Sequence, residues 1–198
     1  LYQRNIDFDL LKSVTDGIFI PVTVGGGIRS IADINNALRA GADKVAINTY
    51  AIHHPEFIPK AVKEFGSQCI VLFIEAKKQE NGRWEAYTDG GREHTGIDAI
   101  EWAKKGIKLG VGEILVTSID QEGTRKGYDI ELTRQIASFA PIPVIAHGGA
   151  GSFDDIKNVI KTGNADAIAV SSLLHYGDCT IGEIKEFLKN NNLDVRKI

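Results

Sequence analysis

The strongest constraint on the fold of this chain is an internal repeat with an offset of 122 residues. Ile20-Pro21-Val22 falls on Ile142-Pro143-Val144, and Gly26-Gly27 falls on Gly148-Gly149. Eight of the 15 positions from residue 20 to residue 34 are identical in the two copies, without a gap. Chance does not produce this level of identity, and a repeated supersecondary unit restricts the architectures open to a chain. The sequence therefore contains two copies of one half of a fold.

The two copies cover residues 1–68 and 123–198. Asp7 falls on Asp129, and after one inserted residue near Asn164 the register continues with Asp43 on Asp166. Residues 69–122 have no counterpart upstream, because Leu1 falls on Gly123. A similar length added before Leu1 gives about 250 residues and eight βα units, the size of a (β/α)8 barrel. We therefore predict an α/β fold, a (β/α)8 TIM barrel of two repeated halves that here lacks about the first two strands.

Apolar patterning predicts six strands that alternate with amphipathic helices. The expected strands are residues 20–24, 44–48, 69–75, 113–117, 142–146 and 167–171, and the expected helices are residues 7–14, 31–40, 55–65, 96–108, 130–139, 153–162 and 181–190. Asn81-Gly82, at the centre of the polar stretch 77–92, predicts a surface β-hairpin. A doubly wound open sheet stays an alternative, but no G-x-G-x-x-G follows a strand, and a twofold repeat suits a closed barrel better.

Composition bounds the function. The 198 residues are 43% hydrophobic and 25% charged, and no low-complexity linker divides them, so we expect one domain over 1–198 that is incomplete at its N-terminus. The net charge of −3 gives no basic excess for nucleic acid, and no apolar run is long enough to span a membrane. The two cysteines, Cys69 and Cys179, form no CxxC pattern, and we expect no secretory leader. We expect a cytoplasmic protein without a structural metal or a cofactor, acting on small metabolites.

Each half carries a glycine cluster after one strand and small polar residues after the next. The clusters are Gly25–Gly27 and Gly148-Gly149, and the polar pairs are Asn48-Thr49 and Ser171-Ser172. Glycine lets main-chain N–H groups approach an anion, and a following helix N-terminus adds positive potential. A tight βα turn alone would explain one cluster, but duplication with matching partners favours phosphate binding. Two such sites at one barrel mouth predict a long substrate with a phosphate at each end.

Further polar residues end or begin the predicted strands. Glu75 closes an apolar strand at the catalytic rim of a barrel, where a carboxylate serves as a general acid or base; a salt bridge to Lys77 or Lys78 is the alternative. Thr117 ends the next strand, and Gly123 lies in the loop behind it. His147 directly precedes Gly148-Gly149, where it either donates to a phosphate or is a hydrogen-bonded structural residue.

Lys44 and Glu113 differ from these residues because each begins a strand. Both are therefore expected near the opposite, N-terminal mouth of the barrel, where a residue usually serves stability and a surface ion pair is the simplest explanation.

The sequence resembles a known family over its whole length. The matching segments include Pro21 through Ser30, Gly41 through Val45, Gly112 through Ser118, and Asp120 through Asp129. Together they resemble the cyclase subunit of imidazole glycerol phosphate synthase, a lyase of histidine biosynthesis and a (β/α)8 barrel of two repeated halves.

The resemblance implies a function and a partner. A glutaminase subunit would dock at the N-terminal mouth to form a heterodimeric glutamine amidotransferase, and ammonia would pass through the barrel. The barrel would use this ammonia to convert a bisphosphorylated ribulosyl aminoimidazole carboxamide to imidazole glycerol phosphate. Gly27, Asn48 and Thr49 would bind one phosphate, and Gly123, Gly149 and Ser172 the other. Lys44 and Glu113 would belong to the ammonia gate.

Three residues depart from the pattern of that family. Glu75 stands where the family has a catalytic aspartate, His147 where it usually has serine, and Glu122 where it usually has aspartate. The opening Leu1 through Asn5 is more similar to a divergent branch found with surface-polysaccharide genes, in which barrel and glutaminase supply ammonia to amidate a sugar for lipopolysaccharide. A barrel without catalytic activity, serving as a scaffold, is a third alternative.

Overall fold

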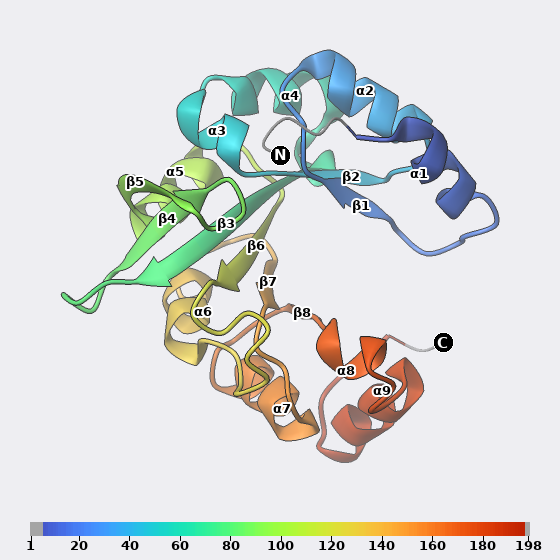
Figure 1. Ribbon diagram of the computed structural model, residues 1–198, viewed down its shortest axis with the longest axis vertical. Coiled ribbons are helices and arrows are strands. Elements are labelled where there is room, and N and C mark those ends of the chain that lie inside the picture. The colour runs from blue at the N-terminus through green and yellow to red at the C-terminus, as the bar shows by residue number, and fades with distance from the viewer. Residues whose placement is uncertain (1–5, 197–198) are drawn as a thin grey trace. The chain divides into compact units, whose positions relative to one another are not determined.

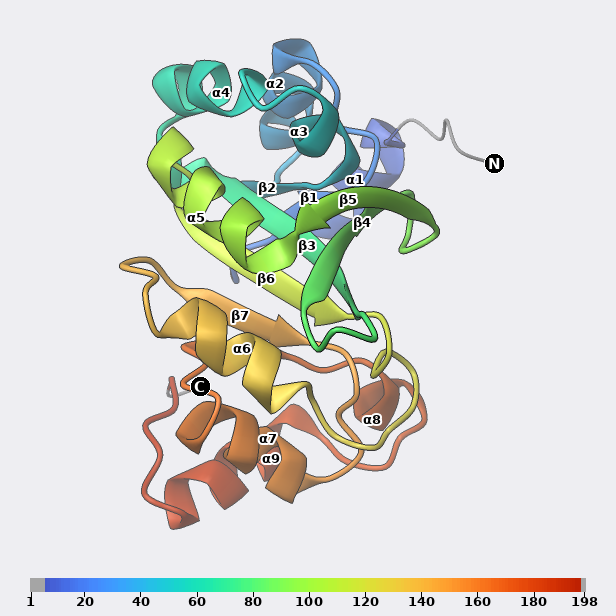
Figure 2. The same ribbon diagram turned by 90° about the vertical axis from the view of Figure 1, so that its left-hand side faces the viewer.

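The computed structural model describes residues 6–196, so the opening segment that suggested the polysaccharide branch lies outside the described residues. The contacts within the chain define two compact units, residues 1–115 and 116–198. Both units are built from strands that alternate with helices (Figures 1 and 2). We describe each unit by itself, and the single barrel domain stays a prediction.

The first unit holds a parallel sheet extended by a hairpin. Strand β1 (Thr23–Gly25) pairs in parallel with β2 (Lys44–Ile47), which pairs in parallel with β3 (Ile70–Lys78). The antiparallel strands β4 (Trp84–Thr88) and β5 (Glu93–Asp98) extend the sheet beyond β3. The helices of the unit are α1 (Phe8–Thr15), α2 (Ile31–Arg39), α3 (Thr49–His53), α4 (Phe57–Phe65) and α5 (Ala99–Leu109), with a 3-10 turn at Ser67–Cys69. Helix α2 packs on β2, and α4 packs on β3 (Figure 1).

The second unit repeats this βα pattern. Strand β6 (Glu113–Ser118) crosses the boundary between the units, and β7 (Val144–His147) pairs in parallel with β8 (Ala167–Ala169). The helices are α6 (Ile130–Ala137), α7 (Phe153–Lys161), α8 (Ser172–His175) and α9 (Ile181–Asn190). Helices α7 and α9 lie side by side (Figure 2), where the rings of Phe153 and Phe187 meet with centroids 5.3 Å apart. The predicted α/β class with parallel βα units of a partial (β/α)8 barrel is confirmed.

The sequence repeat reappears as a repeat of hydrogen bonds. Ser30 Oγ accepts from Asp33 N–H at the start of α2 (3.1 Å), and Ser152 Oγ accepts from Asp155 N–H at the start of α7 (3.2 Å). The carboxylates of these two aspartates accept from the N–H groups of Arg29 and Gly151. Each capping serine satisfies one of the main-chain donors that a helix start leaves without an intrahelical partner. The two copies therefore begin their helices with one shared mechanism.

Aspartates also fix the strands in both copies. Asp43 Oδ2 accepts from Val22 N–H (2.7 Å), and Asp166 Oδ2 accepts from Val144 N–H (2.9 Å). The main-chain N–H of each aspartate donates back to the carbonyl of the same valine. Strand β1 begins at Thr23 and not at the predicted residue 20.

The apolar core of the second unit lies between its strands and helices. Tyr128, Ile156, Val159, Ile184 and Leu188 are buried together there. Burial raises the pKa of Tyr128, and the nearby Asp155 carboxylate adds to the effect; the phenol donates to Ala169 O (3.1 Å). The apolar faces that the helical spacing predicted thus pack into this core.

All six predicted strands and all seven predicted helices are present, with corrected ends. The helix predicted from residue 96 begins at Ala99, because residue 96 is a strand residue of β5 and Asp98 caps the helix. Cys69, predicted in a strand, lies in the 3-10 turn before β3. The hairpin is confirmed, but it is formed by β3 itself with β4, and β5 was not predicted. Among residues 6–196, none of the helices is long and apolar enough to cross a membrane.

We predict that Ser152→Ala destabilises the protein by about 1 kcal/mol, because the change leaves a helix N-terminal donor without its cap. The measurement is the free energy of unfolding in a denaturant titration. Ser138→Ala, at an exposed position at the end of α6, is the control and should change this energy by less than about 0.5 kcal/mol. Equal effects of the two changes would contradict the capping role of Ser152.

Candidate functional site

The first cavity lies in the first unit, beside the ends of β1, β2 and β3. Its volume is about 890 Å³. The five residues predicted for this half of the site all line it: Gly26, Gly27, Asn48, Thr49 and Glu75. The three strands are paired in parallel, so their carboxyl ends lie at one edge of the sheet. Parallel pairing therefore brings together residues that are up to 49 positions apart in the sequence.

The turn after β1 has the conformation that requires glycine. The φ angles of Gly26 and Gly27 are +90° and +77°, in the left-handed region that other residues rarely adopt. A Cβ at Gly26 would meet no atom within 4 Å, so the space beside this residue is open. A turn of this kind presents main-chain N–H groups to an anion. The geometry suits the predicted phosphate site.

Sequence reasoning missed two arginines and two histidines in the same cavity. Arg29, Arg92, His53 and His54 line it together with the glycine turn. Arg29 lies two residues after the last glycine of the cluster, which was a signal that could have found it. Arg92 comes from the hairpin, which was expected on the surface but in fact forms part of the cavity wall. The two guanidinium groups could pair with an anionic ligand, although the carboxylates of Asp7, Glu75 and Asp89 also line the cavity.

The Glu75 carboxylate is buried at the wall of this cavity, with 8% of the residue exposed. Its Oε2 accepts a hydrogen bond from Asn48 Nδ2 at 2.7 Å, and the same amide nitrogen donates to Tyr87 O at 3.0 Å. Tyr87 is also the cross-strand partner of Glu75 in the ladder of β3 and β4. A carboxylate at a cavity wall, held by an amide, is placed for proton transfer with a bound ligand.

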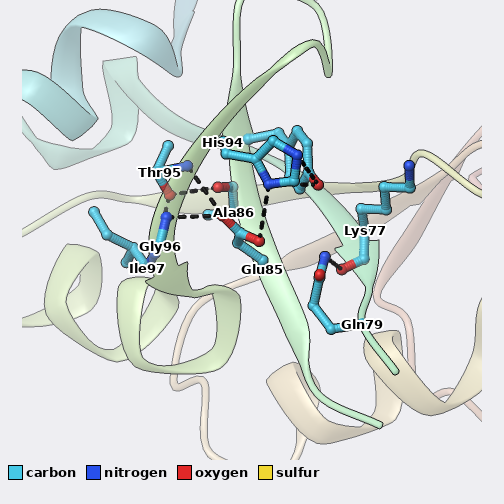
Figure 3. A network of polar contacts seen from close by, with 9 residues as sticks. Lys77, Gln79, Glu85, Ala86, His94, Thr95, Gly96 and Ile97 are labelled. Atoms are coloured by element: carbon cyan, nitrogen blue, oxygen red, sulfur yellow. Dashed lines mark hydrogen bonds and ion pairs between the residues drawn. The ribbon is translucent and has the colours of Figure 1, made fainter. Parts of the chain in front are cut away.

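A polar network holds the hairpin that forms this wall (Figure 3). Glu85 Oε1 accepts from Gly96 N–H (2.7 Å) and Thr95 N–H (3.1 Å), and Glu85 Oε2 lies 3.3 Å from His94 Nδ1. His94 Nδ1 lies 2.9 Å from the Tyr87 hydroxyl. Burial acts to raise the pKa of Glu85, but the hydrogen bonds from Gly96, His94 and Thr95 outweigh it, so this pKa is lowered below its ordinary value of 4.5. The carboxylate therefore stays charged and ties β4 to β5.

We predict that Glu85→Gln destabilises the protein by about 1–2 kcal/mol at pH 7, because a neutral amide replaces a charged acceptor. Since the folded-state pKa of Glu85 is lowered, its stabilisation is present above pH 4.5 and is lost as the pH falls through the folded-state value. The measurement is the free energy of unfolding of both proteins across this range.

Glu80→Gln, in the exposed turn between β3 and β4, is the matched control and should show no such difference. A stability difference between wild type and Glu85→Gln that persists undiminished well below pH 4.5 would contradict the prediction.

The second cavity lies in the second unit and has a volume of about 180 Å³. All six residues predicted there from the repeat and the following loop line it: Gly123, His147, Gly148, Gly149, Ser171 and Ser172. Glu122 also lines it and brings a carboxylate beside the histidine. Gly148 and Gly149 have φ angles of +89° and +104°, so this turn repeats the conformation of the first. Its volume suits one small group such as a phosphate.

Thr117, predicted among the binding residues, does not line this cavity. Its buried hydroxyl lies 2.7 Å from His147 Nδ1, so the contact fixes the imidazole and leaves its Nε2 for another partner. Thr117 thus acts on the site through His147.

The loop after β6 packs closely on the glycine turn. Gly127 N–H donates to Gly149 O (2.8 Å), and a Cβ at residue 149 would come within 2.1 Å of Gly127 O. Arg125 forms an ion pair with Asp178, which joins this loop to the segment between α8 and α9. Close approach of two main chains therefore requires glycine here and sets one wall of the cavity.

Lys44 and Glu113 form an ion pair in the first unit, as the simplest interpretation of the sequence expected. Lys44 is the first residue of β2, and Glu113 is the first residue of β6. Both side chains are partly exposed, and each lies at the amino end of its strand. A role in ammonia passage stays a prediction.

The fold and the two cavities define a class of protein. Parallel βα units that place ligand cavities at the carboxyl ends of their strands are typical of (β/α)8-barrel enzymes. A family model described as "Histidine biosynthesis protein" matches residues 1–180. The chain belongs to this family, and it is a barrel enzyme of the histidine-biosynthesis type.

Proposed function

We propose that this protein is the ammonia-using cyclase subunit of a glutamine amidotransferase of the imidazole glycerol phosphate synthase type. Its substrate would be a bisphosphorylated ribulosyl aminoimidazole carboxamide, which it converts with ammonia to imidazole glycerol phosphate. The observation that carries the proposal is the pair of cavities, one in each unit, with a positive-φ glycine turn in each. Two sites of this kind suit a ligand with two phosphates.

The residues take distinct roles in this proposal. Gly26, Gly27 and Thr49 receive one phosphate, where Thr49 Oγ1 accepts from Asp89 N–H and keeps its own hydrogen for a phosphate oxygen. Glu75 is the acid/base group beside this site. The other phosphate is received in the second cavity, and the residues proposed to bind it are Gly123, His147, Gly148, Gly149, Ser171 and Ser172.

The Lys44–Glu113 ion pair supports the partner that the proposal requires. In this proposal the pair would act as a gate for ammonia, because both residues begin strands of the sheet. The partner would be a glutaminase subunit that docks at this end, and the two chains would form a heterodimer in the cytoplasm.

The decisive test is turnover of the ribulosyl substrate with ammonia by the full-length protein. We expect formation of imidazole glycerol phosphate, and we expect Glu75→Gln to lower kcat by at least about 100-fold, since the variant cannot exchange a proton. Glu80→Gln, at an exposed position of the hairpin turn, is the control and should retain activity. Absence of turnover in the wild type and in Glu75→Asp would exclude the cyclase reaction.

A second candidate is favoured by the identity of residue 75. Glutamate is one methylene longer than the aspartate of the resembled family, and catalytic geometry tolerates only about 0.5 Å of displacement. In this alternative the barrel passes ammonia from a glutaminase for amidation of a sugar in surface-polysaccharide biosynthesis, or serves as a scaffold without turnover. Binding and stimulation of a glutaminase without turnover of the ribulosyl substrate would support it.

The bisphosphate itself gives a prediction that is independent of turnover. A ligand with a phosphate at both ends should bind at least about 100-fold more tightly than either monophosphate fragment, because the second phosphate binds as part of a molecule that is already bound. Calorimetric titration measures the three affinities. Equal affinities of bisphosphate and fragments would show that the two cavities do not serve one ligand.

A further inference from the structure

The side chain of Asn48 does not cap the helix that follows it. Asn48 is the N-cap residue of α3, where an asparagine usually accepts a hydrogen bond from the first turn of the helix, yet it makes no cap bond. Both hydrogens of its amide nitrogen are used elsewhere, by Glu75 Oε2 (2.7 Å) and Tyr87 O (3.0 Å). Two acceptors at one end of the amide fix its orientation, because the reversed amide would place an oxygen against both.

These two bonds conflict with a phosphate-binding role for this side chain. Phosphate oxygens accept hydrogen bonds, and an asparagine has only two side-chain donors. Both are committed within the protein, and the remaining Oδ1 is buried without a partner among the described residues. Thr49 and the glycine turn have donors to offer the anion, whereas the Asn48 amide does not.

Comparison of the two halves shows that the backbone does not demand an amide here. Ser171, the equivalent of Asn48, also precedes a short helix without capping it. The backbone angles are similar, with φ −119° and ψ −88° at Asn48 and φ −121° and ψ −68° at Ser171. Since serine fits this conformation, the backbone alone does not explain the amide at position 48. The hydrogen bonds that the amide donates to Glu75 and Tyr87 do explain it.

The hairpin completes the arrangement. Asn48 donates to Tyr87 O, and two residues further on Asp89 N–H donates to Thr49 Oγ1 (3.1 Å). The first two residues after β2 are therefore bonded to both sides of the buried Thr88. The Tyr87 hydroxyl is held in turn by His94 Nδ1 (2.9 Å), which lies 3.3 Å from Glu85 Oε2. Asn48 thus joins a fixed hairpin to the carboxylate of Glu75.

We propose that Asn48 is a positioning residue for Glu75, which holds the carboxylate in one orientation against the hairpin, and that it is not a ligand of the phosphate. This role rests on the proposed function of Glu75 as the acid/base group. It assigns the anion to Thr49 and the glycine turn, and proton transfer to Glu75 as held by Asn48.

A kinetic test separates the two roles by variant. Asn48→Ser introduces the residue that the second half uses on the same backbone, so folding should be retained. We expect kcat for the ammonia-dependent reaction to fall by at least about 100-fold while KM for the bisphosphate changes less than about twofold; Thr49→Val should instead raise KM. Asn36→Ser, exposed on α2, is the matched control and should be unchanged. A raised KM with unchanged kcat in Asn48→Ser would overturn the proposal.

A spectroscopic test needs no turnover and therefore stands even if the proposed reaction fails. In ¹⁵N–¹H spectra of the full-length protein, inorganic phosphate should shift the main-chain signals of Gly27 and Thr49 but not the side-chain amide signals of Asn48. Those side-chain signals should move in Glu75→Ala and be largely restored in Glu75→Gln, whose carbonyl oxygen still accepts the bond. Asn48 side-chain signals that respond to phosphate, or that ignore the loss of the Glu75 carboxylate, would overturn the proposal.

Discussion

Parallel pairing of β1, β2 and β3 is the constraint on which the site of the first unit depends. Gly25 pairs with Ala46, and Ala46 pairs with Val71, so the three strands run in step. Gly26 directly follows Gly25, Asn48 lies two residues beyond Ala46, and Glu75 lies four residues beyond Val71, still within β3; all three line the first cavity. Parallel pairing of the strands therefore brings together a main-chain anion site, an amide and a carboxylate. The side chains decide what chemistry the edge performs.

Burial of the Glu75 carboxylate then imposes demands on its neighbours. A buried polar group costs free energy unless hydrogen bonds replace those it made to water. Asn48 supplies such a bond, and its second hydrogen needs an acceptor, which the Tyr87 carbonyl provides. This acceptor is in place because β4 is hydrogen-bonded to β3 with Tyr87 opposite Glu75. The hairpin is therefore part of the support for the carboxylate.

The sequence predicts what the repeat and local chemistry determine. Asp7 on Asp129 indicated equivalent helix starts, and both residues do cap their helices, accepting from Leu10 and Leu132 N–H. The glycine turns and the polar pairs that line the two cavities followed from the same register, whereas the exact strand ends did not. Helices α3 and α8, with five and four residues, are too short to show a helical period and were missed. The Glu85–His94 contact could not be read from spacing, because a β-bulge between Ala86 and Tyr87 shifts the ladder.

The two halves show how a duplicated unit takes on different tasks while its frame stays the same. Helix caps, strand-fixing aspartates and glycine turns are retained in both, because each satisfies main-chain groups that any copy of this fold exposes. The halves differ at residues that line the cavities: Asn48 against Ser171, and Gly25 against His147. The first half has the larger cavity and a buried carboxylate with its amide, and the second has a small cavity with an imidazole fixed by Thr117. Residues that bond to the main chain are therefore the ones that the two halves share. Residues that line the cavities differ, and we propose that they assign the acid/base reaction to the first half and phosphate binding alone to the second.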